Sequence, residues 1–318
     1  MAVELRWLPF IVLEKRRFLI LGASGFLGRR LFSVLGPDRS LATFNTHAVE
    51  GGVHFDAASM RLKDTVLRNE PNLRFAFVLY GLTKIDECAR DPEGTSRINV
   101  DSLKVAIDDL VDAGIKPVFA STDAVFDGSR GLWKEDDFTK PILTYAKQKV
   151  AVERHIESKP APWVIARLPK LVSRVPGSNG LFDEWSDYLE AGKPVRCATD
   201  WIFSPADVLD VADGLISLAE GPFSGVFNLG GPEVMSRMGL FKLFLATASR
   251  RKTFDARVEA CRMSDFGFIE SRPLDVSMNP ARVYSALGHS FSRMEEICEE
   301  FVRHRFGSRD ERPRMVSR

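Results

Sequence analysis

Residues 18 to 31, FLILGASGFLGRRL, constrain the fold of this chain more than any other stretch. Residues 18–21 form a short apolar run, which is too brief for a helix and typical of a strand buried on both faces. Glycines follow at 22, 25 and 28, and apolar residues then recur at helical spacing until Gly36-Pro37. Strand, glycine turn and helix predict the phosphate-binding opening of a dinucleotide fold. The alternative is an ordinary glycine-rich turn.

Each glycine of this turn has its own physical reason. Gly22 permits a sharp turn off the strand, Gly25 lets backbone approach a pyrophosphate, and Gly28 lets the helix pack closely on the sheet. The free N–H groups and positive dipole end of the helix would then bind the anion. We therefore predict that the cofactor-binding turn consists of Gly22, Ser24, Gly25, Phe26, Leu27 and Gly28.

The composition is that of an ordinary globular protein. The chain has 318 residues, 45% hydrophobic and 27% charged, with a net charge of +1. This balance argues against nucleic acid or a membrane as a partner, and no apolar run approaches the length of a membrane span. The four cysteines form no C-x-x-C pair and the histidines show no metal-ligand spacing. We therefore expect a cytoplasmic protein without a metal site.

Strands and helices alternate through the first half of the chain. Apolar runs predict strands, and helical periodicity predicts helices through 62–67 and 101–113, the second ending at Gly114. This alternation implies an α/β fold with a doubly wound parallel sheet, the Rossmann architecture. The predicted strands lie at 18–21, 41–44, 53–55, 75–79 and 118–120, with later core strands at 163–166 and 226–229.

Two domains are expected. Residues 1–170 would form the NAD(P)-binding domain, with strands also returned from about 206–230, and residues 171–318 a smaller substrate-binding domain. The tail 307–318 is rich in Arg, Ser and Pro and is expected to be disordered. An amphipathic stripe of Phe291, Met294, Cys298 and Phe301 predicts core packing rather than a partner surface.

The end of the second predicted strand bears on the choice of cofactor. No Asp or Glu stands at 44–47, whereas an acid there would accept a hydrogen bond from the ribose 2′-OH of NAD. Arg29 and Arg30 could reach a 2′-phosphate, or could simply be solvated. These residues favour NADP(H) over NAD(H). Asp56 is predicted to lie beside the adenine.

The fourth predicted strand runs into the edge of the sheet where ligands bind in such folds. We therefore expect Tyr80, Gly81 and Thr83 to contact the cofactor.

Tyr145 and Lys149 are the candidate catalytic pair. They are one helical turn apart on a predicted helix through 141–156, and an ammonium there would lower the phenol pKa from its usual value of ~10. Such a tyrosine could donate a proton to a carbonyl. Tyr80 and Lys84 share the spacing but lie at a strand end, where the spacing does not bring them together. Thr122, at another strand end, would supply a second hydrogen-bond donor.

Several segments resemble the extended short-chain dehydrogenase/reductases, and most of all the dTDP-4-dehydrorhamnose reductases. The likeness runs from the glycine turn, whose G-x-x-G-x-x-G spacing is that of the extended family, to about residue 288. The segments that carry it are STDAVFDG (121–128), PILTYAKQKVAVE (141–153), TKIDECARDPE (83–93), INV (98–100), DWIFSPADVLDVA (200–212) and SRPLDVSMN (271–279).

The resemblance implies a role for each candidate residue. Tyr145 would protonate the C4 carbonyl of a sugar, Lys149 would tune Tyr145 and bind the nicotinamide ribose, and Thr122 would orient the carbonyl. Five further residues are candidates for ligand contacts. We assign Arg167 to the cofactor. We assign the other four to the substrate: Asp123, Asn179, Lys170 and Arg272. Each could instead have a structural role. Lys170 stands where the family has an aromatic residue, and this difference leaves the identity of the sugar open.

These features predict an NADPH-dependent reductase of a nucleotide-diphospho-4-keto-6-deoxy sugar, a homodimer like many of its family. Two alternatives stay open. One is an NAD-dependent sugar-nucleotide epimerase on the same fold, and the other is a non-catalytic regulatory subunit resembling that of methionine adenosyltransferase. Related dehydratases have an acid directly after the Thr-Asp pair, where this chain has Ala124. Dehydration is therefore not expected.

Overall fold

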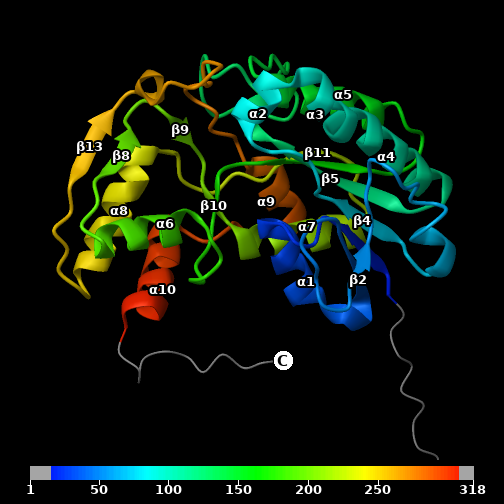
Figure 1. Cartoon of the computed structure of the whole chain (residues 1–318), viewed down its shortest axis with the longest axis horizontal. Helices are drawn as coiled ribbons and strands as arrows, with labels where there is room; N and C mark the ends of the chain where they lie inside the picture. The colour runs from blue at the N-terminus through cyan, green and yellow to red at the C-terminus, as the bar shows by residue number, and fades with distance from the viewer. Residues whose placement is uncertain (1–15, 308–318) are drawn as a thin grey trace, which may run out of the picture.

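The computed structural model describes residues 16–307, and its centre is a seven-stranded parallel sheet (Figure 1). The strand order is β11-β6-β5-β4-β1-β2-β3, so the chain moves outward from β1 in both directions. This is the doubly wound arrangement that the sequence predicts. The strands are β1 (Phe18–Leu21), β2 (Ser40–Phe44), β3 (Val53–His54), β4 (Phe75–Val78), β5 (Lys116–Thr122), β6 (Val164–Leu168) and β11 (Gly225–Asn228).

Alternate residues of β1 enter opposite layers of the core. Phe18 and Ile20 pack with α1 and α7, whereas Leu19 and Leu21 pack on the other face with α4 and α5. All four side chains are buried, which is why the strand reads as a continuous apolar run. The helices are α1 (Phe26–Arg39), α4 (Leu103–Asp112), α5 (Thr144–Glu157) and α7 (Val208–Glu220).

A second core lies beside the sheet, on the left of Figure 1. Its centre is aromatic, with the rings of Phe182 and Phe244 stacked at 4.9 Å and Phe301 edge-on to both. The predicted apolar stripe is buried, which confirms that it packs inside the protein: Met294, Cys298 and Phe301 lie in this second core, and Phe291 lies in the core of the sheet. The elements around this core are α6 (Leu181–Glu190), α8 (Arg237–Ser249), α10 (Met294–Phe306) and the paired strands β8 (Val195–Ala198) and β13 (Val258–Cys261).

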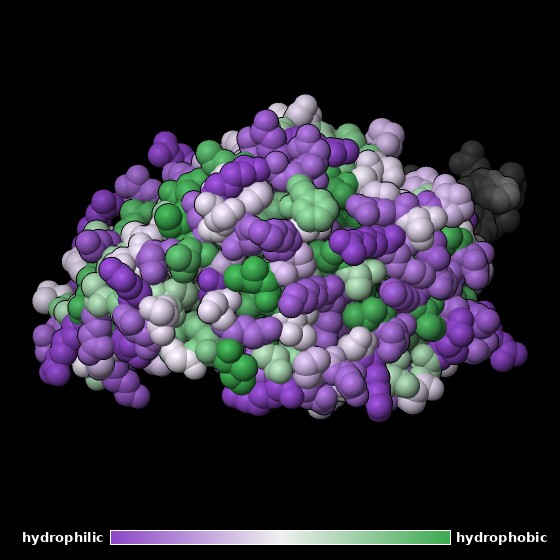
Figure 2. All heavy atoms as spheres, turned by 90° about the horizontal axis from the view of Figure 1, so that it is seen from above, coloured by the Kyte–Doolittle hydropathy of each residue, from purple (hydrophilic) through white to green (hydrophobic). Residues whose placement is uncertain are grey.

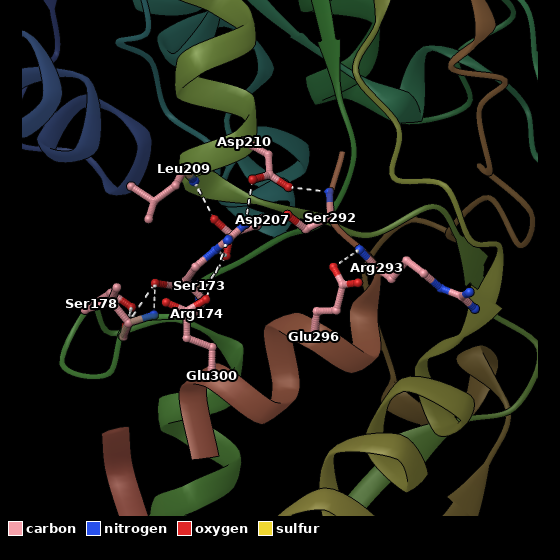
Figure 3. Close-up of polar contacts among 11 residues, drawn as sticks. Ser173, Arg174, Ser178, Asp207, Leu209, Asp210, Ser292, Arg293, Glu296 and Glu300 are labelled. Carbon is pink, nitrogen blue, oxygen red and sulfur yellow. Dashed lines mark hydrogen bonds and ion pairs between the residues drawn. The ribbon is translucent and has the colours of Figure 1, made fainter. Parts of the chain in front are cut away.

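Arg174 joins the second core to the sheet (Figure 3). Its guanidinium pairs with Asp207 at 3.2 Å and with Asp210, both at the start of α7, and with Glu300 of α10 at 3.6 Å. It also donates to the Ser292 hydroxyl at 2.9 Å. Because Asp207 is fully buried, its charge depends on this partner.

Two predicted helices differ from the structure. Residues 62–66 form turns that lead into a short 3₁₀ helix, Leu67–Asn69, and the buried Asp109 carboxylate accepts from the Lys63 N–H at 3.2 Å. The helix predicted at 101–113 instead begins with a π-helical segment, Arg97–Ser102. Elsewhere Gly36, at φ +70°, breaks the helical backbone within α1 where the sequence predicts an end. The predicted tail, beyond Gly307, lies outside the described residues.

The face seen from above in Figure 2 is largely hydrophilic, with apolar side chains in separate islands. No helix within residues 16–307 combines the length and hydropathy needed to cross a membrane.

Replacing Arg174 with methionine is expected to lower the free energy of unfolding by about 3–5 kcal/mol, because Asp207 would keep a buried, unpaired charge. Urea unfolding measures the loss. Arg250→Met is the matched control, since Arg250 pairs with Glu299 at the surface, where side-chain exposures are 60% and 53%, and such pairs contribute about 1 kcal/mol or less. Equal losses in the two variants would contradict the assignment of Arg174 as a buried link.

Candidate active site

A cleft of about 470 Å³ runs along the carboxyl ends of the central strands. All six residues of the predicted glycine turn line it, as do Tyr80, Gly81 and Thr83 after β4. Asp56, which follows β3, also lines the cleft and lies across β2 from the glycine turn. The structure thus brings almost all of the predicted cofactor residues to one cleft, which we call the cofactor cleft.

The glycine turn can form only because side chains are absent at two positions. Gly22 has φ +92°, and a Cβ there would lie 2.9 Å from the Tyr80 nitrogen. A Cβ on Gly28 would clash with the Gly22 carbonyl oxygen, because the first turn of α1 packs directly on the chain leaving β1. The close packing points the N-terminus of α1 at the cleft, where its free N–H groups favour an anion.

The end of the cofactor cleft beside β2 and β3 carries no acid directly after β2. Asn45, Thr46 and His47 line it there. The Asp56 carboxylate accepts from the Ser59 hydroxyl at 2.7 Å and the Ala58 N–H at 3.0 Å, and these bonds lower its pKa.

The two arginines considered for a 2′-phosphate do not line this cleft. Arg29 instead donates to the carbonyl oxygens of Ser24 and Ser178 at 3.2 and 3.3 Å.

A second cleft of about 400 Å³ adjoins the first, and we call it the substrate cleft. Tyr145 and Thr83 line both clefts. Thr122 and Asp123, at the end of β5, line the substrate cleft on the side of the sheet. The opposite wall comes from the second core and the segment after β13, through Trp201, Arg237, Met263, Phe266, Phe268 and Arg272.

Helix α5 positions the candidate catalytic pair. Lys149 is buried and donates from Nζ to the Ala120 carbonyl oxygen of β5 at 2.8 Å. Its Nζ lies 5.9 Å from the centroid of the Tyr145 ring, one turn earlier. Both residues line the cofactor cleft, and Tyr145 also faces the substrate cleft. In the other pair with this spacing, Tyr80 and Lys84, the Lys84 side chain is exposed and forms an ion pair with Glu87.

The pKa values at this junction are dominated by burial. Burial lowers the pKa of Lys149 to about 8 and raises that of Asp123 to about 7. Burial, with the nearby Asp123 carboxyl, also raises the pKa of Tyr145. This is opposite to the direction that the Tyr-Lys spacing predicts, because desolvation of the phenolate outweighs an ammonium that is 5.9 Å from the ring and bonded to a carbonyl.

A network of buried side chains supports α5 from behind. Gln148 accepts from the Asn99 amide at 2.8 Å and donates to the Thr95 hydroxyl at 2.9 Å. Asn99 also bonds both the N–H and the carbonyl of Leu82, in the loop that lines the cofactor cleft. Sequence reasoning missed Gln148, whose position directly before Lys149 was its only signal.

Arg167 has a structural environment. It pairs with Glu153 of α5 at 2.9 Å, with each side chain only 3% exposed, and the Ser121 hydroxyl donates to the same carboxylate. Arg167 lines neither cleft, which differs from its predicted contact with the cofactor. Glu153 and Ser121 form a buried group with Arg167 behind the strand end that carries Thr122.

Two of the predicted substrate residues also lie outside both clefts. Asn179 is exposed, with φ +58°. Lys170 lies two residues after Leu168, the last residue of β6, and Leu168 pairs with Thr122 of β5. Burial lowers the pKa of Lys170. By contrast, sequence reasoning missed Arg237 and the aromatic wall, although Trp201 stands within a segment used for the family resemblance.

Arg272 lies in the wall of the substrate cleft. Its Nη2 donates to Asp86 at 2.6 Å, and its guanidinium lies 4.2 Å from the ring centroid of Phe268. Its Nη1 is buried and has no hydrogen-bond partner within the described residues. No group of His, Cys, Asp and Glu side chains within residues 16–307 could hold a metal ion.

Comparison with known protein families assigns the chain to one of them. The model of the RmlD substrate binding domain matches residues 16–305. The chain belongs to this family. Relatives of the chain include a probable low-salt glycan biosynthesis reductase, Agl14, of Haloferax volcanii, 24% identical over 87% of this chain and 94% of the relative. They also include a dTDP-4-dehydrorhamnose reductase of Sinorhizobium fredii, 24% identical over 90% and 96%.

A third relative is the methionine adenosyltransferase 2 subunit beta of Bos taurus, 26% identical but over only 51% of this chain and 49% of that protein. Among solved structures, the dTDP-4-dehydrorhamnose reductase of Bacillus anthracis in complex with NADP has a TM-score of 0.78, with 21% identity over 90% of this chain and 98% of that one. MoeE5 in complex with UDP-glucuronic acid and NAD has a TM-score of 0.73, with 20% identity over 90% and 97%. These structures share the fold.

Asp123 is expected to titrate near pH 7, because burial disfavours its charged form. Asp56 should titrate below the usual 3.8, because hydrogen bonds favour its charged form. Carboxyl ¹³C chemical shifts followed from pH 3 to 9 separate the two groups. Asp123 should remain protonated at pH 5 while Asp56 is fully ionised. A shared midpoint would show that Asp123 is solvated.

Proposed function

We propose that this protein is an NADPH-dependent reductase of a nucleotide-diphospho-4-keto-6-deoxy sugar. The observation that carries the proposal is the position of Tyr145, which lines both the cofactor cleft and the substrate cleft. A phenol at this junction can reach a substrate carbonyl that faces a nicotinamide ring. The names of the full-length RmlD-type relatives, both reductases, support the same reaction class.

The residues of the cofactor cleft fit a dinucleotide. The Gly22 to Gly28 turn and the N-terminus of α1 would hold the pyrophosphate, since a Cβ at Gly22 or Gly28 would fill the space that backbone occupies there. The buried ammonium of Lys149 would bind the nicotinamide ribose. A bound reduced nicotinamide supplies a hydride. NADP(H) is favoured because Asn45, Thr46 and His47 place no carboxylate against a 2′-phosphate.

The substrate cleft has the groups that a nucleotide sugar requires. Arg272 presents an unpartnered guanidinium nitrogen, and Arg237 lies in the same wall, so two cations are available for a diphosphate. The rings of Phe266 and Phe268, stacked 5.5 Å apart, line the cleft as well. Such rings can stack on a nucleobase.

The reaction would be a reduction at C4. As hydride arrives at the carbonyl carbon, Tyr145 donates its phenolic proton to the carbonyl oxygen, and the resulting phenolate takes a proton back from solvent. The raised pKa of Tyr145 keeps the phenol protonated at neutral pH, which is the form a proton donor needs. Lys149 stabilises the phenolate as it forms, and Thr122 donates a hydrogen bond to the same oxygen.

Two other functions were considered. An epimerase would retain NAD through purification and consume none, whereas a reductase consumes one NADPH for each sugar reduced. A regulatory subunit like the beta subunit of methionine adenosyltransferase would have no need of Tyr145 and Lys149 as a pair. The buried Lys149 and its contact with Ala120 favour a catalytic role.

Tyr145→Phe is expected to lower kcat by about 10²–10⁴-fold, the usual contribution of a positioned proton donor. The assay follows loss of NADPH absorbance with a dTDP-4-keto-6-deoxyhexose. Tyr188→Phe is the control, because Tyr188 lies on α6 with 38% of its surface exposed. Full turnover in Tyr145→Phe would exclude Tyr145 as the donor.

The wild-type protein is expected to have a higher kcat/KM with NADPH than with NADH. His47→Asp should reverse this preference, because a carboxylate after β2 repels the 2′-phosphate and accepts from the ribose 2′-OH. Ratios of kcat/KM for the two cofactors provide the measurement. His54→Asp serves as the control, since His54 is exposed and does not line the cleft. A wild-type preference for NADH would refute this assignment.

A further inference from the structure

The catalytic helix begins without a capping side chain of its own. α5 starts at Thr144, directly before Tyr145, and the preceding residue, Leu143, makes no side-chain capping bond. The first N–H groups of a helix have no partner within the helix, and a nearby polar side chain usually satisfies at least one of them. The first turn of α5 contains no acid. Another part of the chain must therefore supply the cap.

Glu270 supplies it from 126 residues away. The backbone N–H of Thr144 donates to both carboxylate oxygens of Glu270, at 3.0 and 3.1 Å, and the Thr144 hydroxyl donates to one of them at 2.8 Å. A carboxylate at a helix N-terminus also interacts favourably with the helix dipole. Glu270 thus provides both the hydrogen bonds and the charge of an N-terminal cap.

Glu270 stands within the segment that forms one wall of the substrate cleft. The segment after β13 crosses the top of the view in Figure 1 towards α2 (Ile85–Arg90). Residues on both sides of Glu270, Phe268 and Arg272, line the substrate cleft. Arg272 is fixed in turn by its bond to Asp86 of α2. The wall that would hold the nucleotide sugar is therefore bonded directly to the first residue of the catalytic helix.

The rest of α5 is anchored independently of Glu270. Lys149 bonds to Ala120, and Gln148 bonds to Asn99 and Thr95, all through buried atoms. Loss of the cap would leave these contacts intact and free only the first turn of the helix, where Tyr145 lies. The effect should therefore fall on the position of the phenol rather than on the fold.

We propose that Glu270 is a positioning residue for Tyr145. It acts through Thr144, and it couples the wall of the substrate cleft to the proton donor. This inference rests on the proposed function, because it takes Tyr145 as the donor to a substrate carbonyl.

The test compares Glu270→Ala and Glu270→Gln with the control variant Glu259→Gln. Glu259 lies on β13, and its side chain is 56% exposed. Glu270→Ala is expected to lower kcat about 10-fold or more, since small misplacements of a catalytic group cost up to about 10². Glu270→Gln keeps one acceptor oxygen and should recover part of the loss. The KM for NADPH and the melting temperature should stay close to wild type. An unchanged kcat in Glu270→Ala overturns the inference.

Thr144→Val tests whether Glu270 acts through Thr144. This variant loses the hydroxyl bond but keeps the N–H bond, so its kcat should fall less than that of Glu270→Ala. The double variant should be no worse than Glu270→Ala alone. Fully additive losses would show that the two residues act separately and would contradict the proposed route.

Hydrogen exchange separates this inference from the proposed function. The amides of residues 144–147 should exchange faster in Glu270→Ala than in wild type or Glu259→Gln, whatever the substrate. Faster exchange with normal kcat would leave the proposed function standing and reject the positioning role. A wild-type protein that reduces no nucleotide-diphospho-4-keto sugar with NADPH would reject both.

Discussion

The site depends on one buried charge. The ammonium of Lys149 is held away from solvent and bonded to the Ala120 carbonyl at the end of β5. A buried cation is costly unless it is bonded, so this contact fixes the middle of α5 against the sheet. Tyr145 lies one turn earlier on the same helix, where the Glu270 cap holds the first turn. The strand end that receives Lys149 also carries Thr122, so the Lys149 contact sets the relative positions of Lys149 and Thr122.

The features that sequence predicts well are those set by local backbone chemistry. The FLIL run and the three glycines determine the β1–α1 turn because no other residues fit at Gly22 and Gly28. Apolar runs predicted all seven strands of the sheet, and helical periodicity predicted the helix that carries Tyr145 and Lys149. The helix predicted at 62–67 is wrong: the segment forms turns, and its apolar spacing gives no information on its bond to the distant Asp109.

Roles of charged residues are less predictable because they depend on partners. Arg167 at a strand end could equally contact a phosphate or a carboxylate, and only the structure shows Glu153 beside it. The same limit applies to the direction of a pKa change. The spacing of Tyr145 and Lys149 predicts the ammonium near the phenol, but it gives no information on burial, which has the larger effect here.

The return of the chain to its central sheet has a consequence for synthesis on the ribosome. α7 covers Phe18, Ile20 and the apolar side of α1, and β11 completes the sheet by pairing with β6, yet these elements come only at residues 208–228. A nascent chain that ends before them exposes this apolar surface to water, and exposed apolar surface promotes aggregation. The half of the chain that forms most of the sheet therefore cannot complete its core as it emerges, and it must wait until α6 and β8 of the second core have also been translated.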